Sequence, residues 1–501
     1  MSAGTNSIRE SEVIAHHPQL SLAVELLLAV GVSALLLIPC VWLDHIQAGD
    51  LSSHQYNAWL AGEIKSGAAP GLALVPLWTN TLADFALEAL PRAMGAVWTE
   101  RVVVGASVLI FFWGVFSLVA TATERRPWIL APSIGMLSYG LIFHMGFLNY
   151  YLSTGLCLWV MVLLWRRPSL LRAAAAGVLL VLATLAHALP VAWAAAVLIY
   201  WHLARRWTGI LRMALPFAAL AALGLLAAIL TQMFPHRWSL EGIVSLGGLA
   251  GITGVEQVWL FGGRYMLVAA GLLLIWLTML LERIDQDEFL SDPVAQLWLL
   301  HLAAFVILPS AIQFPQYQHV LAYIPQRISL LGAVFLCVTL GRGTHGRGVT
   351  RLSVLAAAVY FTFLYVDDRA FNRLEREITD LVRKLPPGQR VVAAISDSDT
   401  RLNAPLHVVD RACIGHCFSY GDYEPATGQF RIRVVGPNRV VAPNMTVVQE
   451  IENGEHVVTP AEAPLYSVCL NDKPDGTRFI LRALRAGERT CGFSLPISPR
   501  L

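Results

Sequence analysis

Asp50 is an ionisable residue in the stretch from Gly49 to Tyr56, which begins a few residues after the first long apolar run. A carboxylate at the edge of a bilayer is costly and commonly functional, so Asp50 is a candidate site residue. It could instead cap the helix that begins there, although Ser52 or Ser53 could also fill that role. The sequence therefore leaves two hypotheses for Asp50, a reactive carboxylate or a helix N-cap.

Several histidines lie near predicted helix ends on the same side as Asp50. They are His54, His144, His187, His236 and His319. His187 stands in a turn between two apolar runs, where a polar ring has few neighbours outside its own helix bundle. It could bind a phosphate or hydroxyl group of a substrate, or it could satisfy carbonyl groups of the loop.

The composition sets the environment in which these side chains must work. The chain has 501 residues, of which 56% are hydrophobic and 14% charged, with a mean hydropathy of +0.58. Soluble domains carry about a quarter charged residues, so the sequence predicts an integral membrane protein. The net charge of +2 favours no particular partner, and no basic tract predicts nucleic-acid binding.

Eleven apolar runs are long enough, or nearly so, to cross a membrane as helices. They cover about residues 20–43, 102–121, 128–145, 149–165, 173–187, 189–204, 213–233, 264–281, 294–312, 327–340 and 352–366. The first run lacks a basic cluster before it and a small-residue cleavage site near its end, so we interpret it as a retained anchor.

The basic residues of the loops predict the orientation of these helices. Twelve Lys and Arg residues fall in five loops on one side when eleven helices alternate, against six on the other side in much longer connections. The first side is therefore predicted to be cytoplasmic, together with the N-terminal tail 1–19. The 44–98 loop and the C-terminal part then lie outside together.

Residues 367–501 are predicted to form an extracytoplasmic soluble domain. They carry 34 of the chain's 70 charges. Segments rich in Val and Ile, separated by Gly, Pro, Asn and Asp, predict a mostly β fold. The predicted strands lie within 388–395, 429–435, 439–448 and 456–459.

Four cysteines belong to this domain: Cys413, Cys417, Cys469 and Cys491. In an exported domain they suggest two disulfides, with three possible connectivities. A zinc site that uses His416, or free thiols, are the alternatives, although no second closely spaced pair completes four zinc ligands.

The first outer loop contains two candidate helices that are too short and too polar to span. Ser52–Ile64 places Tyr56 and Trp59 at helical spacing, and Gly67 follows it. Thr79–Ala93 has one apolar face and one acidic face. Both are predicted to lie on the outer leaflet as interfacial helices that border a lipid-accessible cavity.

This arrangement resembles the glycosyltransferase C superfamily. The residues that carry the resemblance are Asp50, Tyr56, Ala58, Ala61, Ser66 and Gly67. Two interfacial helices in the first outer loop, about eleven spans and an outer C-terminal domain are also similar to that superfamily. The resemblance covers the architecture of the whole chain, with 20–366 as the transmembrane glycosyltransferase domain.

The resemblance implies transfer of a sugar, a hexose or a pentose, from a polyprenyl-phosphate carrier to an acceptor at the outer face. Asp50 would act as the general base, since an attacking hydroxyl must lose its proton. The departing phosphate needs an Arg that can bind two oxygens. Arg327 is the first candidate and Arg264 a weaker one, while a lone interfacial Arg can also be a snorkelling anchor. His54, Tyr56 and His187 would contact substrate.

The sequence departs from the superfamily pattern beside Asp50, which is followed by Leu51 rather than a second acidic residue. No Asp-x-Asp motif occurs in the loop, so a divalent metal is possible but has no motif to support it. Asp44 is the candidate second carboxylate, although a plain interfacial Asp is also expected at that helix end.

We therefore interpret the chain as a polytopic glycosyltransferase of the bacterial inner membrane, with a lipid-linked sugar and membrane lipids as its partners. A transporter or flippase of a lipid-linked saccharide is the first alternative. Ionisable residues gather at one face and are nearly absent from the middle of the runs, which favours a surface-facing site over a transport path. A non-catalytic membrane component that presents its C-terminal domain to a partner is the third class.

Overall fold

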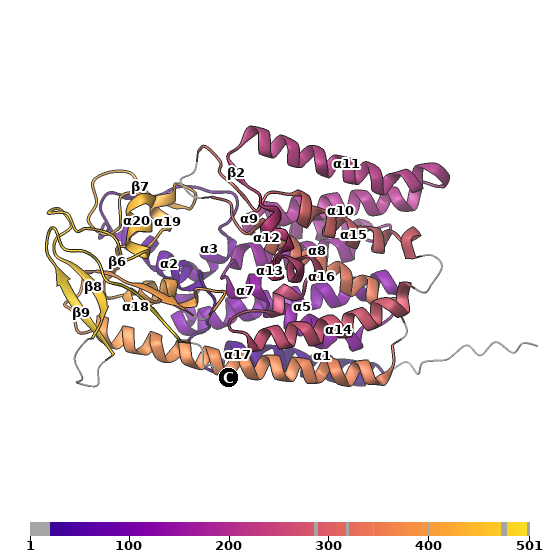
Figure 1. Ribbon diagram of the computed structural model, residues 1–501, viewed down its shortest axis with the longest axis horizontal. Helices are drawn as coiled ribbons and strands as arrows, with labels where there is room; N and C mark the ends of the chain where they lie inside the picture. The colour runs from indigo at the N-terminus through magenta and orange to yellow at the C-terminus, as the bar shows by residue number, and fades with distance from the viewer. Residues whose placement is uncertain are drawn as a thin grey trace, which may run out of the picture.

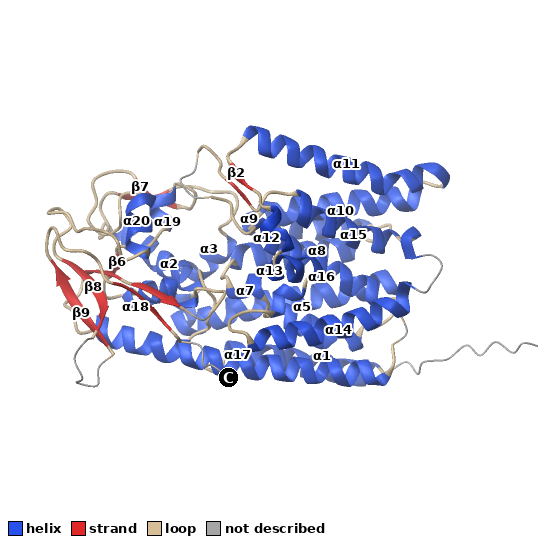
Figure 2. Cartoon of the chain, viewed as in Figure 1, coloured by secondary structure: helices blue, strands red, loops and turns tan. Residues whose placement is uncertain are grey.

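The structure is a computed structural model that describes residues 21–284, 289–316, 320–343, 345–398, 400–471 and 478–497. The helices lie side by side in one bundle, and most of the strands gather at one end of it (Figures 1 and 2). The 44–98 loop, which is predicted to be the first outer loop, and the C-terminal region occupy that end together.

Each of the eleven apolar runs forms a helical segment. Six are long and apolar enough to cross a membrane: α1 (Leu22–Leu37) continued by η1 (Ile38–Cys40), α5 (Ala96–Thr123), α10 (Ala188–Arg206), α11 (Gly209–Met233), α14 (Arg264–Ile284) and α17 (Arg347–Val382). The shorter segments are η2 (Trp128–Leu130) with α6 (Ala131–Ser138) and α7 (Leu141–His144), α8 (Leu148–Leu164), α9 (Leu170–Ala186), α15 (Pro293–Ile307) and α16 (Ile324–Leu340). The chain is therefore a multi-pass helical membrane protein, and eleven as the number of spans stays a prediction.

Glycines let the central helices α5 and α8 approach closely. A Cβ added to Gly114 would lie 3.0 Å from Leu158 Cβ, and one added to Gly155 would lie 3.0 Å from the backbone nitrogen of Phe111. Small residues at such contacts are typical of helix packing in membranes. At the periphery, α1 and α11 instead expose large apolar side chains, such as Leu27 and Phe217, which suits contact with hydrocarbon.

Connecting elements complete the bundle. They are β2 (His236–Arg237), α12 (Leu240–Val244), α13 (Leu246–Thr253), η3 (Val255–Val258), η4 (Phe289–Ser291) and β3 (Ala311–Ile312). The strands β2 and β3 pair antiparallel.

The first outer loop forms α2 (Leu51–Ser66), β1 (Leu72–Leu74), α3 (Leu82–Ala89) and α4 (Pro91–Met94). Gly67 ends α2 with φ 83°, a conformation that favours glycine. The second predicted helix is divided, because Pro91 lacks a backbone N–H and begins a new helix. The first turns of α2 are buried against α3 and α18, and a position of these helices on a leaflet stays a prediction.

The C-terminal region is mixed rather than mostly β. Its strands are β4 (Arg390–Val392), β5 (Ala394–Asp397), β6 (Phe418–Ser419), β7 (Ile432–Val434), β8 (Leu465–Leu470), β9 (Phe479–Leu484) and β10 (Gly492–Leu495). Its helices are η5 (Ala404–His407), α18 (Val408–Cys413), α19 (Glu424–Thr427) and α20 (Met445–Glu452). The largest sheet has the order β6-β4-β8-β9, β5 pairs parallel with β10, and β7 pairs antiparallel with β1 of the first outer loop.

The predicted strand at 439–448 is wrong, because two asparagines direct the backbone elsewhere. The side chain of Asn438 accepts hydrogen bonds from the backbone N–H groups of Val440 and Val441. Asn444 caps α20 by accepting from the N–H of Val447 at 3.1 Å. Such local bonds compete with the ladder of a sheet.

The helix α17 carries the chain from the bundle into the C-terminal region without a break at the predicted boundary between 366 and 367. In the second half of α17, the side chains of Phe371, Leu374 and Ile378 are buried. One face of this segment is therefore packed, and the domain boundary stays a prediction.

Candidate functional site

Two glycines fix the backbone of Asp50 against the turn before α8. The backbone N–H of Asp50 donates to the carbonyl oxygen of Met145 at 3.2 Å. A Cβ on Gly49 would lie 2.5 Å from that oxygen, and a Cβ on Gly146 would lie 2.2 Å from the nitrogen of Asp50. Gly146 also has φ +78°, which favours glycine. The close approach of these two segments determines where α2 begins.

Asp50 occupies the N-cap position of α2, but its side chain makes no capping hydrogen bond. Instead, its Oδ1 lies 3.5 Å from Nε2 of His407, and its Oδ2 accepts a hydrogen bond from the hydroxyl of Tyr423 at 3.4 Å. The carboxylate is about a quarter exposed and lines a cavity. The side chain of Asp50 therefore does not cap α2, and its reactive role stays a prediction.

His407 links Asp50 to a second carboxylate. Its Nδ1 lies 2.8 Å from Oδ2 of Asp410, whose Oδ1 accepts from the hydroxyl of Ser419. Although burial opposes the charged ring, hydrogen bonds and charge from the two carboxylates raise the pKa of His407 well above its usual range. Asp50 therefore faces an imidazolium that Asp410 holds in place.

His54, one turn further along α2, forms the inner wall of the cavity. Its Nδ1 lies 2.9 Å from Oδ1 of Asp84 and 3.3 Å from Oε1 of Glu424. Asn149 donates to the other oxygen of Asp84 at 3.0 Å. Burial alone would lower the pKa of His54, but Asp84 raises this pKa to about 9. Burial raises the pKa of Glu424 to about 8. His54 is thus a cation whose Nδ1 faces Asp84 and Glu424.

Arg327 lies on the opposite wall, near the start of α16. Its Cζ is 4.5 Å from the ring centroid of Phe147 and 5.2 Å from that of Tyr150, and Nη1 donates to the carbonyl of Ala322 at 2.6 Å. The residue is only 8% exposed, and its Nε has no hydrogen-bond partner. Within the described ranges, no carboxylate forms an ion pair with this guanidinium, so its charge is available to an anion.

His187 adds a neutral hydrogen-bond donor beside Arg327. Its Nδ1 accepts from the backbone N–H of Leu189 at 3.2 Å and so caps α10. Burial and the charge of Arg327 lower the pKa of His187 to about 3. The neutral ring must then carry its proton on Nε2, because Nδ1 is an acceptor.

These walls enclose one cavity of about 370 Å³, within the range of small-molecule sites. Four stretches of chain line it: Gly49–His54 with Asn80, His144–Tyr150 with His187, Val320–Arg327, and parts of the C-terminal region from Leu402 to Glu452. The C-terminal part contributes polar side chains, including Asn403, Gln449 and Glu452. The structure thus brings together Asp50, His54, His187 and Arg327, which sequence analysis selected.

Three other predicted site residues do not line the cavity. Asp44 is exposed and forms an ion pair of 2.7 Å with Arg376. Arg264 is buried and paired with Asp367 of α17, so its charge is already neutralised. Tyr56 is buried, and its hydroxyl accepts from the backbone N–H of Ser419 at 3.0 Å.

The three remaining candidate histidines lie in different parts of the chain. His144 lines the cavity, His236 lies in the exposed strand β2, and His319 is outside the described residues. In the described parts of the chain, no group of three or more His, Cys, Asp or Glu side chains is arranged to hold a metal ion.

A buried ion-pair network holds the C-terminal region against the bundle. Arg411 of α18 lies 2.9 Å from Oε1 of Glu375 in α17 and 3.3 Å from Oε1 of Glu100 in α5, and its Nε donates to Gln55 in α2 at 2.7 Å. Because Asp410 precedes Arg411, the same helix also positions His407. The docking of α18 therefore builds one wall of the site.

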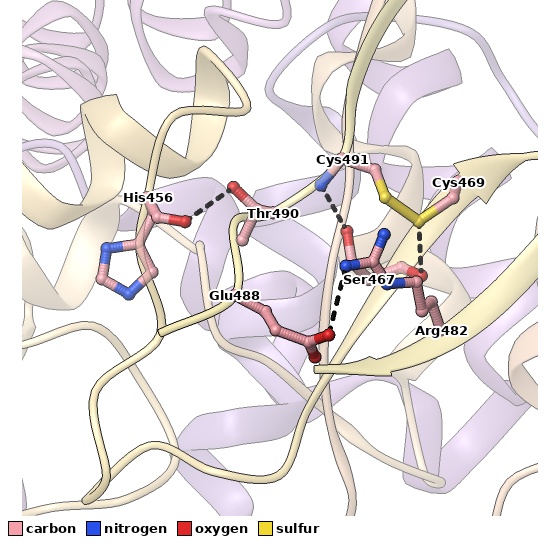
Figure 3. The surroundings of a disulfide bond; sticks show 7 residues. All are labelled: His456, Ser467, Cys469, Arg482, Glu488, Thr490 and Cys491. Atoms are coloured by element: carbon pink, nitrogen blue, oxygen red, sulfur yellow. Dashed lines mark hydrogen bonds and ion pairs between the residues drawn. A yellow bond between two sulfur atoms is a disulfide. The ribbon is translucent and has the colours of Figure 1, made fainter. Parts of the chain in front are cut away.

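The four cysteines of the C-terminal region form two disulfides, Cys413–Cys417 and Cys469–Cys491. The first joins the end of α18 to the start of β6. The second lies beside Ser467, whose hydroxyl accepts from the backbone N–H of Cys491 at 3.0 Å (Figure 3). His416 contacts the carbonyl of Leu385 at 2.9 Å.

Sequence reasoning missed His407, Tyr423 and Glu452. No local pattern marks them, since Tyr423 stands 373 positions from the carboxylate that it contacts. The one signal in the sequence is the aromatic and acidic tract 420–425, to which Tyr423 belongs.

Comparisons with known proteins found two similar solved structures and no matching family. No family model matches the sequence, and a search of curated proteins found no match. The chain is similar to the cryo-EM structure of arabinofuranosyltransferase AftD from Mycobacteria, with 15% identity and a TM-score of 0.43, over 91% of this chain and 36% of that one. A mutant of the same enzyme gives 16% identity and a TM-score of 0.37, over 90% and 37%. The chain thus spans little more than a third of that enzyme's length, and so distant a likeness assigns no activity.

Proposed function

We propose that the protein is a membrane glycosyltransferase that moves a sugar from a polyprenyl-phosphate carrier to an acceptor hydroxyl in this cavity. The observation that supports this most directly is that Asp50 and Arg327 face one cavity. One is a carboxylate that can take a proton, and the other is a buried guanidinium without a carboxylate partner among the described residues. Sugar transfer from a phosphate needs both.

On the acceptor side, Asp50 takes the proton of the attacking hydroxyl as its oxygen bonds to the anomeric carbon. The imidazolium of His407 and the hydroxyl of Tyr423 orient the carboxylate at 3.5 and 3.4 Å. Asn403, Gln449 and Glu452 supply hydrogen-bonding groups on this side of the cavity.

On the donor side, the bond between the anomeric carbon and the phosphate oxygen breaks, and the electron pair leaves with polyprenyl phosphate. Arg327 can bind two oxygens of the leaving phosphate, while Phe147 and Tyr150 hold its guanidinium in place. The Nε2–H of His187 is a neutral donor to the same group. Burial strengthens both interactions, because few waters screen them.

We further propose that the site lies at the outer membrane surface. The cavity lies where α2, α3 and the C-terminal region meet the N-terminal ends of α8, α10 and α16. The basic loops predict that this end faces away from the cytoplasm. A polyprenyl-phosphate sugar in the outer leaflet would then enter from the bundle, and the acceptor from the C-terminal region.

The test is release of polyprenyl phosphate by the purified protein in nanodiscs supplied with pentosyl and hexosyl polyprenyl-phosphate donors and glycan acceptors. Wild-type protein should release the lipid phosphate with at least one donor, and Arg327→Gln should bind that donor far more weakly. Arg92→Gln, which removes an exposed arginine outside the cavity, is the matched control. Movement of intact donor across the bilayer without release would replace transferase by transporter.

A further inference from the structure

A second cavity lies at the opposite end of the bundle. It has a volume of about 500 Å³ and is formed by the last residues of α5, α8 and α10 together with the first residues of α11 and α15. The candidate site, in contrast, is bordered by the first residues of α8 and α10. The two cavities therefore have no lining residue in common.

Positive charge dominates this second cavity. Arg166, Arg205 and Arg212 line it, against Glu124 as its single lining carboxylate within the described residues. Arg166 pairs with Glu124 at 2.5 Å, but both side chains are more than half exposed, so solvent weakens that pair. Two positive charges remain without a carboxylate in the lining.

Backbone carbonyls hold the other two arginines without neutralising them. Arg205 donates to the carbonyl of Trp165 at 3.4 Å, and Arg212 donates to that of Ser291 at 3.1 Å. Each guanidinium has five N–H donors, so one carbonyl bond leaves most of them for a ligand. The two helices α10 and α11 thus present oriented cations to one space.

Two stacked tryptophans form the floor. The ring centroids of Trp165 and Trp201 are 4.1 Å apart, and the Cζ of Arg205 lies 5.5 Å from the ring of Trp201. The indole Nε1 of Trp165 is buried and has no hydrogen-bond partner in the described parts of the chain. The two indoles thus give the cavity a rigid aromatic wall beside Arg205.

An apolar surface begins at the rim of this cavity. On the first turns of α11, Ile210 is 82% exposed, and Met213 and Phe217 are each 74% exposed. Such a surface fits acyl chains. Basic groups between helices, next to hydrocarbon-facing residues, are the arrangement that recognises lipid headgroups.

We propose that this cavity binds the phosphate headgroup of an anionic phospholipid, with the acyl chains along α11. Arg166, Arg205 and Arg212 contact the phosphate, and the tryptophan floor limits its depth. The lipid fills the space between α11 and the rest of the bundle, where α11 contacts only α10 and α15 closely.

The test compares lipid retention by the full-length protein, measured by native mass spectrometry after purification in phosphatidylglycerol or phosphatidylcholine. Wild-type protein should retain one phosphatidylglycerol and no phosphatidylcholine. The triple change Arg166→Gln, Arg205→Gln and Arg212→Gln should weaken retention roughly a hundredfold, since each arginine near an anionic lipid contributes about fivefold.

The matched control changes three exposed arginines at the same end that do not line the cavity, Arg125, Arg172 and Arg351, to Gln. This control should retain the lipid, and equal losses in both triple variants would overturn the proposal in favour of diffuse attraction. Equal unfolding temperatures in phosphatidylcholine would show that the cavity variant folds. If inorganic phosphate displaces the lipid completely at equal concentration, the ligand is a soluble phosphate ester and the lipid is rejected. None of these measurements depends on sugar transfer.

Discussion

The substitution Asp50→Asn should strongly reduce turnover while leaving the stability of the fold nearly unchanged. The amide keeps the size of the side chain and an oxygen that can accept from Tyr423, but it cannot take a proton. We expect turnover to fall about 100- to 10,000-fold, which is the usual contribution of a positioned base and corresponds to about 3 to 5 kcal/mol of barrier.

The structure predicts a small effect of the same change on stability. The side chain of Asp50 makes no cap bond to α2, and its contacts with His407 and Tyr423 are long, at 3.5 and 3.4 Å. His407 keeps Asp410 at 2.8 Å in the variant. The loss should therefore stay below about 1 kcal/mol, as for a partly exposed ion pair.

The assay is release of polyprenyl phosphate under single-turnover conditions, with a thermal unfolding curve for each variant. Asp44→Asn is the matched control, because its exposed pair with Arg376 lies outside the cavity. Tyr423→Phe should lose less than Asp50→Asn, since it removes one orienting bond and leaves the base. Wild-type turnover in Asp50→Asn would refute the proposed base and direct attention to Glu452, a second carboxylate of the cavity.

Four further experiments test the structure around the site. Gly146→Ala should displace Asp50 and reduce turnover strongly, because its Cβ would lie 2.2 Å from a backbone nitrogen, whereas Gly177→Ala has open space and should be silent in the same assay. Arg411→Met leaves two buried carboxylates unpaired and should cost about 3 to 5 kcal/mol, detected as easier proteolysis of the C-terminal region. Because the pKa of His54 is raised to about 9, its stabilising contribution is complete below about pH 6.5 and is lost as the pH rises to 9. The unfolding temperature should fall over that range in wild type and fall less in His54→Asn, in which the shifted pKa values of His407 and Glu424 remain, and equal slopes in the two proteins would contradict this role of His54. The four disulfide cysteines should resist alkylation until reductant is added, and ready labelling without it would reject an oxidised domain.

Hydrophobic periodicity was sufficient to locate the helices but not to choose between similar charged residues. Arg264 and Arg327 both stand at the start of an apolar run and look alike in the sequence. Their difference is Asp367, which lies 103 positions after Arg264 and neutralises it in the fold. No such partner reaches Arg327 among the described residues. Only the packing of α14 on α17 could distinguish the two.

The C-terminal half of the site was harder to predict for a similar reason. Asn438 and Asn444 convert a stretch rich in Val into a turn and a helix through side-chain bonds, which a count of β-branched residues does not register. In the sequence, the acidic residue nearest to His407 is Asp410, which His407 contacts in the structure. The contact of His407 with Asp50 results from the docking of α18. Contacts that join distant segments leave no local pattern.

The separation of Asp50 from its partners also has a consequence for biosynthesis. Tyr423 emerges from the ribosome 373 residues after Asp50, a delay of roughly 20 to 75 seconds at ordinary translation rates. In the last part of that interval, after Arg327 has been made, the nascent chain contains the residues proposed to hold the phosphate, but Asp50 does not yet have Tyr423 beside it. Under the proposed function, an unfinished chain lacks a complete site, and transfer would begin only when the C-terminal region has folded.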